Sequence, residues 1–197
     1  MFTGIVEEVG EIAEAESGVL LVRSELVSSD AGIGDSVAVD GVDLTVTRIA
    51  PEGLLFNVMP ETYRLTTLGQ AAPGRRVNLE RSVRAADRLS GHIVRGVVEG
   101  VGVVALRVDD GDAVIMTYEA PPELLEFVIE RGPICVDGVS LTVIRKTEGS
   151  FSVSIVVHTQ HNTTILERAV GDTVNLESDI MMRYVANAVA TLARDRD

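Results

Sequence analysis

The chain contains no tryptophan, and aromatic residues make up only 4% of its 197 residues. The hydrophobic fraction is nevertheless 46%, so valine, isoleucine and leucine must fill the core. A single cysteine, Cys135, excludes an internal disulfide and is typical of a reducing compartment. No group of Cys, His, Asp or Glu residues has the spacing of metal ligands, and we expect no metal site.

Positive charge is also scarce, because 17 Lys and Arg residues stand against 30 Asp and Glu residues, for a net charge of -13. Such an acidic chain is unsuited to a nucleic-acid backbone or an anionic membrane as a partner. The sequence has no apolar run of about 18 residues and no signal-peptide pattern. We therefore expect a soluble, cytoplasmic protein that binds neither nucleic acid nor membrane.

What the sequence does contain is an internal repeat. The segment VAVDGVDLTV at Val37–Val46 returns as ICVDGVSLTV at Ile134–Val143, 97 residues later. The same offset relates Thr66-Thr67 to Thr163-Thr164 and the VNLE of Val77–Glu80 to that of Val174–Glu177. GIVEEVG at Gly4 and GVVEGVG at Gly96 are 92 residues apart, so the second copy carries a five-residue insertion after its first strand. A period of this length indicates a duplicated small domain and not a solenoid repeat.

Strand patterns dominate both copies. Residues 37–47 alternate apolar and polar side chains around an Asp40-Gly41 turn. Other short runs, rich in apolar or β-branched residues, lie at 54–59, 77–81, 113–118, 151–157 and 173–177, with turn residues between them. Short strands at this spacing predict an all-β fold, with a small closed antiparallel barrel in each copy.

Helical patterns are few. Apolar residues recur at helical spacing after Pro121-Pro122, and residues 82–88 are polar, as in a linker. Residues 180–197 have no counterpart in the repeat and place Ile180, Val185, Val189 and Leu192 on one helical stripe. That stripe could pack on its own barrel or contact another subunit, and we favour the contact. We predict an N-terminal barrel at 1–84, a C-terminal barrel at 85–180 and an oligomerisation helix at 181–197.

Candidate site residues are polar side chains where strands meet turns. They are Thr3, Asp43, Thr45, Glu61 and Thr62 in the first copy, and Ser140, Thr142, His158 and Thr159 in the second. Hydroxyl groups at strand ends suit a neutral, polyhydroxylated ligand. A single threonine in a strand more often reflects β-propensity. The recurrence of the pattern in both copies favours a binding site for the set.

The motifs MFTGIVEE, VDGV-x-LTV (twice), ETYRLTTLG, VNLER and GHIVRG together resemble the riboflavin synthase family, over essentially the whole chain. The resemblance implies two six-stranded Greek-key barrels and C-terminal helices that join three subunits into a homotrimer. It implies active sites between the first barrel of one subunit and the second barrel of a neighbour. The implied reaction is a dismutation of 6,7-dimethyl-8-ribityllumazine to riboflavin and 5-amino-6-ribitylaminouracil, without a cofactor. Lumazine synthase is a further candidate partner.

The resemblance also implies ligand positions along both copies. In the first barrel's motifs these are Gly4, Ile5, Val6, Asp43, Leu44, Thr45, Asn57, Val58, Met59, Pro60, Glu61 and Thr62. In the second they are Gly96, Val97, Val98, Arg131, Ser140, Leu141, Thr142, Val156, Val157, His158, Thr159, Gln160, His161 and Asp179.

Several positions depart from the family pattern. Asp40 replaces an asparagine, Glu99 an aspartate, and Val157-His158-Thr159 a P-E-T motif. The two departures that bear on catalysis are Asp43, which replaces the usual cysteine, and Val97, which replaces a histidine. If the chain is a synthase, proximity of two bound lumazines supplies much of the catalysis. Asp43 then acts as a base or holds the attacking water, with Ser140, Thr142 and His158 as further catalytic residues. The alternatives are a non-catalytic lumazine- or riboflavin-binding relative of antenna or carrier type, and a structural double barrel without a ligand. The polar side chains at the ligand positions argue against the last.

Overall fold

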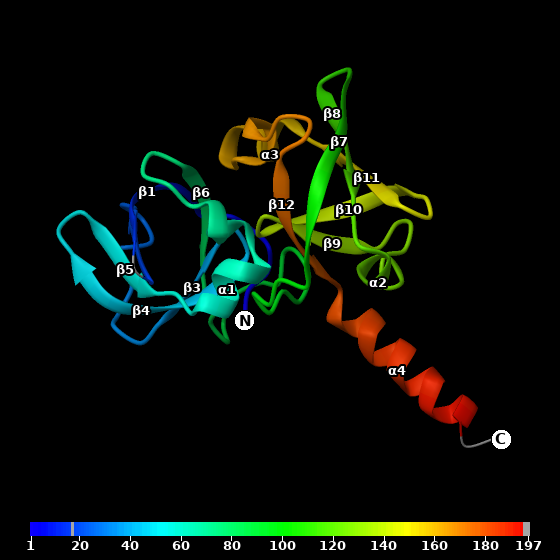
Figure 1. The fold of residues 1–197 in the computed structure, drawn as a ribbon, viewed down its shortest axis with the longest axis horizontal. Coiled ribbons are helices and arrows are strands. Elements are labelled where there is room, and N and C mark those ends of the chain that lie inside the picture. The colour runs from blue at the N-terminus through cyan, green and yellow to red at the C-terminus, as the bar shows by residue number, and fades with distance from the viewer. Residues whose placement is uncertain (17, 195–197) are drawn as a thin grey trace.

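A computed structural model describes residues 1–16 and 18–194. Within these residues the chain forms two closed barrels of six antiparallel strands each, side by side, with a C-terminal helix that projects away from both (Figure 1). The predicted fold class is therefore confirmed.

The first barrel closes in the order β1-β2-β5-β4-β3-β6. Its strands are β1 (Glu8–Glu16), β2 (Val19–Arg23), β3 (Ser36–Val39), β4 (Val42–Ala50), β5 (Gly53–Asn57) and β6 (Arg76–Arg81). The second barrel has the equivalent circular order. Its strands are β7 (Gly100–Asp110), β8 (Ala113–Glu119), β9 (Pro133–Val136), β10 (Val139–Lys146), β11 (Ser150–Ile155) and β12 (Thr173–Ser178).

The alternation read from the sequence decides which side chains face the barrel interior. On β4, Val42, Leu44 and Val46 are buried, whereas Asp43 and Thr45 are exposed, as expected for a strand with one buried face. Valine, leucine and isoleucine fill both cores, with one or two phenylalanine or tyrosine rings in each. Branched aliphatic side chains therefore fill the space that aromatic rings occupy in many other cores.

Helices are short except at the C-terminus. They are α1 (Pro60–Leu65), α2 (Pro122–Leu125), α3 (Val157–Asn162) and α4 (Ile180–Arg194), with 3-10 turns at Thr67–Gln70 and Ile165–Glu167. The strands predicted to continue to residues 59 and 157 end earlier, at Asn57 and Ile155, because a helix follows each. The resemblance places ligand strands at 57–62 and 156–161, but the second half of the first segment and nearly all of the second are helical. Residues 195–197 of the predicted C-terminal helix lie outside the described residues.

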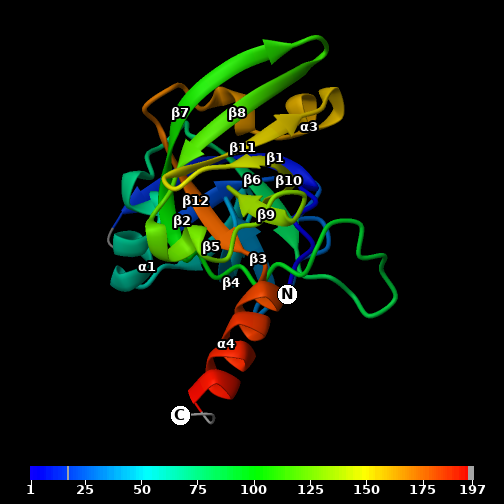
Figure 2. The ribbon, with the colours of Figure 1, turned by 90° about the vertical axis from the view of Figure 1, so that its right-hand side faces the viewer.

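The insertion in the second copy lengthens one hairpin. β7 has 11 residues and β8 has 7, against 9 and 5 in the equivalent strands β1 and β2. This hairpin projects past its barrel in Figure 2 and runs beside α3. The side-chain amide of Gln160 on α3 donates to the carbonyl of Asp112 at the hairpin turn, at 2.8 Å.

The two barrels meet around a pseudo-two-fold axis built from the repeated motifs. Gly41 and Gly138 face each other so closely that a Cβ on either would lie within 2.8 Å of the other's backbone. The Asn78 amide donates to the carbonyl of Asp137, and the Asn175 amide donates to the carbonyl of Asp40, both at 2.8 Å. Reciprocal contacts of this kind require both copies to keep the same residues. The repeated DG and VN motifs thus hold the two barrels together.

The helix α4 begins at the end of β12 and leaves the barrel at once (Figure 2). Arg183 in its first turns bonds Glu99 and lies over the ring of Phe127, with its guanidinium carbon 4.1 Å from the ring centroid. Beyond this anchor, Val185, Val189 and other apolar side chains of the helix are more than half exposed. Within residues 1–16 and 18–194, no helix combines the length and the apolar character needed to cross a membrane.

Candidate functional site

The segment that opens each copy lies against the other barrel. The Ser140 N–H at the start of β10 donates to the carbonyl of Gly4 at 2.7 Å, and the Asp43 N–H at the start of β4 donates to the carbonyl of Gly96 at 2.9 Å. A Cβ on Gly4 would lie 2.6 Å from the Ser140 Cβ, and one on Gly96 would lie 2.6 Å from the Asp43 Cβ. Both glycines also have positive φ angles, of 74° and 80°. Close approach and backbone conformation therefore both require glycine here.

The first candidate site combines residues 43–45 of β4, the 57–62 turn into α1, and residues 96–98. Because β4 and β5 run antiparallel, the start of β4 and the end of β5 lie at the same end of the barrel. Asp43 and Thr45 point outward on β4, and Val97 is half exposed. Pro60 supplies the first turn of α1, a position where its missing N–H costs nothing. The structure thus assembles a polar shelf from three segments that are far apart in the sequence.

The second candidate site repeats this arrangement with residues 140–142 of β10, the 156–161 turn into α3, and residues 4–6. Ser140 is partly exposed and Thr142 is exposed, both on the outward face of β10. His158 lies on the exposed side of α3, and its carbonyl accepts a hydrogen bond from the Asn162 side-chain amide at 2.7 Å. Ile5 is 45% exposed beside this shelf. Each barrel thus presents an open, half-polar surface at the equivalent place.

One residue of the second site was not among the predicted ligands. His92 is buried, and its Nδ1 lies 2.7 Å from the Oγ of Ser140. Burial lowers the pKa of His92, whereas the charge of Asp179 acts in the opposite direction. The His92 Nε2 has no hydrogen-bond partner among the described residues. The GHIVRG motif contains this histidine, a side chain that can accept a proton near neutral pH, but nothing in the sequence pairs it with Ser140.

The two outlying predicted residues lie at the edges of the second barrel. Arg131 has a φ of 67°, and its N–H donates to the carbonyl of Val143 at 2.7 Å. Its exposed side chain therefore leaves the barrel next to the 140–142 strand. Asp179 lies between β12 and α4, where its carboxylate accepts from the Met181 N–H at 3.0 Å. Asp179 therefore lies at the start of α4 and is also close enough to His92 for its charge to act on that imidazole.

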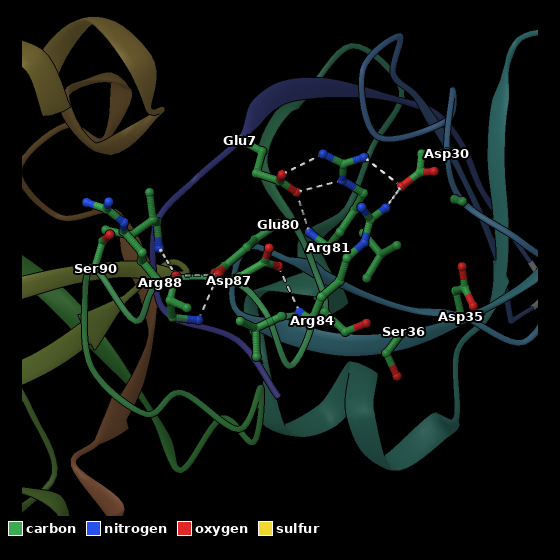
Figure 3. Close-up of a pocket in the computed structure, with 16 residues that line it drawn as sticks. Glu7, Asp30, Asp35, Ser36, Glu80, Arg81, Arg84, Asp87, Arg88 and Ser90 are labelled. Atoms are coloured by element: carbon green, nitrogen blue, oxygen red, sulfur yellow. Dashed lines mark hydrogen bonds and ion pairs between the residues drawn. The ribbon is translucent and has the colours of Figure 1, made fainter.

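A cavity of about 520 Å³ lies elsewhere, between β3, β6 and residues 82–90 (Figure 3). Figure 3 shows Glu7 and Asp30 on either side of the Arg81 guanidinium, which bonds both. The Glu7 pKa is lowered, because its bonds to Arg81 outweigh its partial burial. Among the described lining residues, Thr3 and Ile5 belong to the predicted site. The paired charges of this cavity serve the packing of the linker, and the candidate sites are the two shelves.

The single cysteine is not part of either shelf. Cys135 is buried with Phe2, Ala38 and Val94 between the barrels. Burial raises the pKa of its thiol well above the ordinary value, so it lacks the thiolate that a nucleophile needs. In the part of the chain that the structure describes, no three His, Cys, Asp or Glu side chains are grouped as metal ligands.

Comparison with known proteins agrees with this architecture. The family of the lumazine binding domain matches residues 3–82 and again residues 95–179. The chain belongs to this family of duplicated lumazine-binding barrels, and the resemblance seen in its motifs is confirmed. Its relatives include the riboflavin synthase of Mycobacterium tuberculosis, 43% identical over 193 residues that cover 94% of this chain and 96% of the relative. The riboflavin synthase of Bacillus subtilis is 36% identical over 189 residues, covering 94% of this chain and 88% of that protein.

Solved structures give the same fold. LumP in complex with 6,7-dimethyl-8-(1'-D-ribityl) lumazine aligns with a TM-score of 0.82, and LumP with riboflavin aligns with 0.84. Both alignments cover 90% of this chain and 99% of LumP at 22% identity. At this identity the likeness shows the double-barrel fold alone.

Proposed function

We propose that this chain is a riboflavin synthase, which converts two molecules of 6,7-dimethyl-8-ribityllumazine into riboflavin and 5-amino-6-ribitylaminouracil. The observation that carries the proposal is the pair of equivalent shelves, each assembled from three distant segments. A dismutation needs two bound copies of one substrate, and a duplicated barrel offers two sites of the same shape. Full-length similarity to riboflavin synthases supports the same conclusion.

The ribityl chain is the part of the substrate that the outward hydroxyls suit. Thr45 on β4 and Thr142 on β10 occupy equivalent exposed positions. Hydroxyl groups can both donate to and accept from the hydroxyls of a polyol. We assign the other predicted ligand residues of each shelf to the lumazine molecule that this shelf binds.

Different side chains stand at the equivalent positions 43 and 140. The Asp43 carboxylate is exposed and can accept a proton or orient the water that adds to the ring of the lumazine. Ser140 is within hydrogen-bond distance of His92, and the lowered pKa of His92 keeps its imidazole neutral near pH 7 and able to accept a proton. We therefore assign proton abstraction from the acidic 7-methyl group to the Ser140–His92 pair and the addition of water to Asp43.

Each shelf is open in a single chain, so a second barrel must face it to enclose the ligands. We infer a homotrimer in which the exposed stripe of α4 joins the subunits, in keeping with the family resemblance. Ile180 of the predicted stripe is already buried within its own chain, so the exposed stripe consists of Met181, Tyr184, Val185, Val189 and Leu192. Burial of these side chains between subunits would remove them from water. We also infer a cytoplasmic location, and an association with lumazine synthase as the source of the substrate.

The test is to mix the purified protein with 6,7-dimethyl-8-ribityllumazine and follow riboflavin fluorescence. Turnover is expected from the wild type. Asp43→Asn keeps the shape and removes the charge, so turnover should fall about a hundred-fold or more while riboflavin affinity changes little. A wild type that binds the lumazine and never forms riboflavin would refute the proposal. It would favour the second candidate function, a non-catalytic lumazine- or riboflavin-binding protein. The observation behind this candidate is that Asp43 and Val97 stand where the family has a cysteine and a histidine.

A further inference from the structure

The glutamate of each VNLE motif holds the segment that opens its own copy. Glu80 on β6 is 5% exposed and accepts from the Thr3 N–H and hydroxyl, both at 2.7 Å, and from the Gly4 N–H at 3.0 Å. Glu177 on β12 is 2% exposed and accepts from the Arg95, Gly96 and Val97 N–H groups at 2.8, 3.0 and 2.9 Å.

Each held segment completes the site of the other barrel. Glu80 belongs to the first barrel, yet the carbonyl of Gly4 accepts from Ser140 in the second. Glu177 belongs to the second barrel, yet the carbonyl of Gly96 accepts from Asp43 in the first. Both glutamates are buried and both oxygens of each carboxylate already accept from these segments, so we treat neither as a ligand contact.

We propose that Glu80 and Glu177 are positioning residues that act crosswise, each fixing the segment that completes the ligand site of the opposite barrel. The inference deepens the proposed function, on which it rests, because it adds two residues that control the sites without lining them. A buried carboxylate that accepts several N–H donors is a strong, charge-assisted contact. Its loss would let residues 3–6 or 95–98 move relative to the strand they face.

The negative charge of Glu80 and Glu177 suits carboxylates that accept several backbone N–H groups each. Burial raises the pKa of Glu177 and of Glu80, and the backbone N–H donors lower it, offsetting part of that rise. Neutral glutamine has the same size but must turn its NH₂ group toward some of these N–H donors. Those donors would then be left without an acceptor in a buried place, which is costly.

The experiment uses the full-length protein labelled with ²H and ¹⁵N and titrated with riboflavin. The Thr45 amide reports on the first site and the Thr142 amide on the second. Glu177→Gln should weaken the affinity measured at Thr45 about ten-fold, the equivalent of one charge-assisted hydrogen bond, and leave that at Thr142 unchanged. Glu80→Gln should do the reverse.

A matched control is Glu8→Gln. The Glu8 carboxylate also holds backbone N–H groups, those of Glu25 at 2.6 Å and Val27 at 2.9 Å, but on a loop outside both shelves. It should leave both titrations unchanged. If Glu177→Gln fails to fold, Gly96→Ala perturbs the same segment from its other side and should give the same pattern at Thr45.

Two results would overturn the proposal. One is weakening confined to the barrel that carries the substituted glutamate, and the other is equal weakening at both reporters. If the wild type binds riboflavin but shows no turnover, the proposed function is wrong, while the affinities at Thr45 and Thr142 still test the positioning role. If turnover is normal but each substitution weakens binding in its own barrel or in both, only the positioning role is wrong.

Discussion

The interface between the barrels should depend on Arg168 more than on any exposed charge. Its Nε donates to Asp137 at 2.8 Å and its Nη2 donates to Asp40 at 2.9 Å. Both carboxylates are essentially inaccessible to water, since the side chain of Asp40 is 0% exposed and that of Asp137 is 1% exposed. Asp40 keeps a second guanidinium, that of Arg75, at 3.0 Å. Arg168 is the arginine that bonds both acids, and Arg168→Met would leave Asp137 buried without its cation.

Removing one partner of a buried ion pair typically costs about 3–5 kcal/mol. We expect a loss in this range for Arg168→Met in urea-induced unfolding at pH 8, together with a fall in Tm of about 6–20 °C for a chain of this size. The penalty should shrink at pH 5, because a carboxyl group buried without a cation takes up a proton more readily.

The matched control is Arg76→Met, which breaks the ion pair with Glu167. Both side chains of that pair are more than a third exposed, so the loss should be at most about 1 kcal/mol. Adding Asp137→Asn to Arg168→Met should recover part of the stability, because asparagine tolerates the left-handed φ of 44° found here. Equal losses for Arg168→Met and Arg76→Met, or a penalty for Arg168→Met independent of pH, would refute the reasoning.

Three further predictions concern α4, the hydroxyl of Thr45 and the Asp40 carboxyl group. Deleting the chain from Val185 onward should give monomers in light scattering, because the exposed stripe of α4 is lost; a trimer after deletion would contradict the proposed assembly. Thr45→Val should weaken riboflavin binding by about 0.5–1.5 kcal/mol in fluorescence titration, and unchanged affinity would remove this hydroxyl from the site. Burial and the neighbouring Asp137 raise the Asp40 pKa from 3.8 to about 7, so carboxyl ¹³C NMR should show a midpoint near 7. The stabilisation from Asp40 should be complete below pH 3.8 and lost as the pH rises through 7, and a midpoint below 4 would contradict this.

The repeat made the fold predictable from the sequence. The alternation around Asp40-Gly41 placed two strands and their turn correctly, because the period of a half-buried strand is set by local geometry. The helices α1 and α3 were missed for an equally physical reason. The residues of α1 and α3 follow directly from strands and have no buried apolar side chain, so they carry no helical periodicity to read.

The crossing of the two opening segments could not be read from the sequence. It depends on contacts such as Gly4 with Ser140, across more than a hundred residues, which no local pattern specifies. The role of Glu80 and Glu177 was hidden for the same reason. In VNLE they look like ordinary strand residues, and only the fold shows that their carboxylates end at the backbone of another segment. His92 stood in a quoted motif but gained a meaning only from its distance to Ser140.

Duplication gives the two shelves the same backbone, and the differences between them therefore lie in single side chains. Asp43 and Ser140 occupy equivalent positions, and each donates its N–H to a glycine of the other copy. If the chain is a synthase, its two identical substrates must take unequal roles, one losing a proton and the other adding a nucleophile. A charged acceptor in one shelf and a serine beside a neutral histidine in the other provide that inequality. Exchanging the two residues, as Asp43→Ser with Ser140→Asp, should therefore abolish turnover while both shelves still bind riboflavin. Turnover retained by the exchanged protein would show that the asymmetry of the site comes from elsewhere.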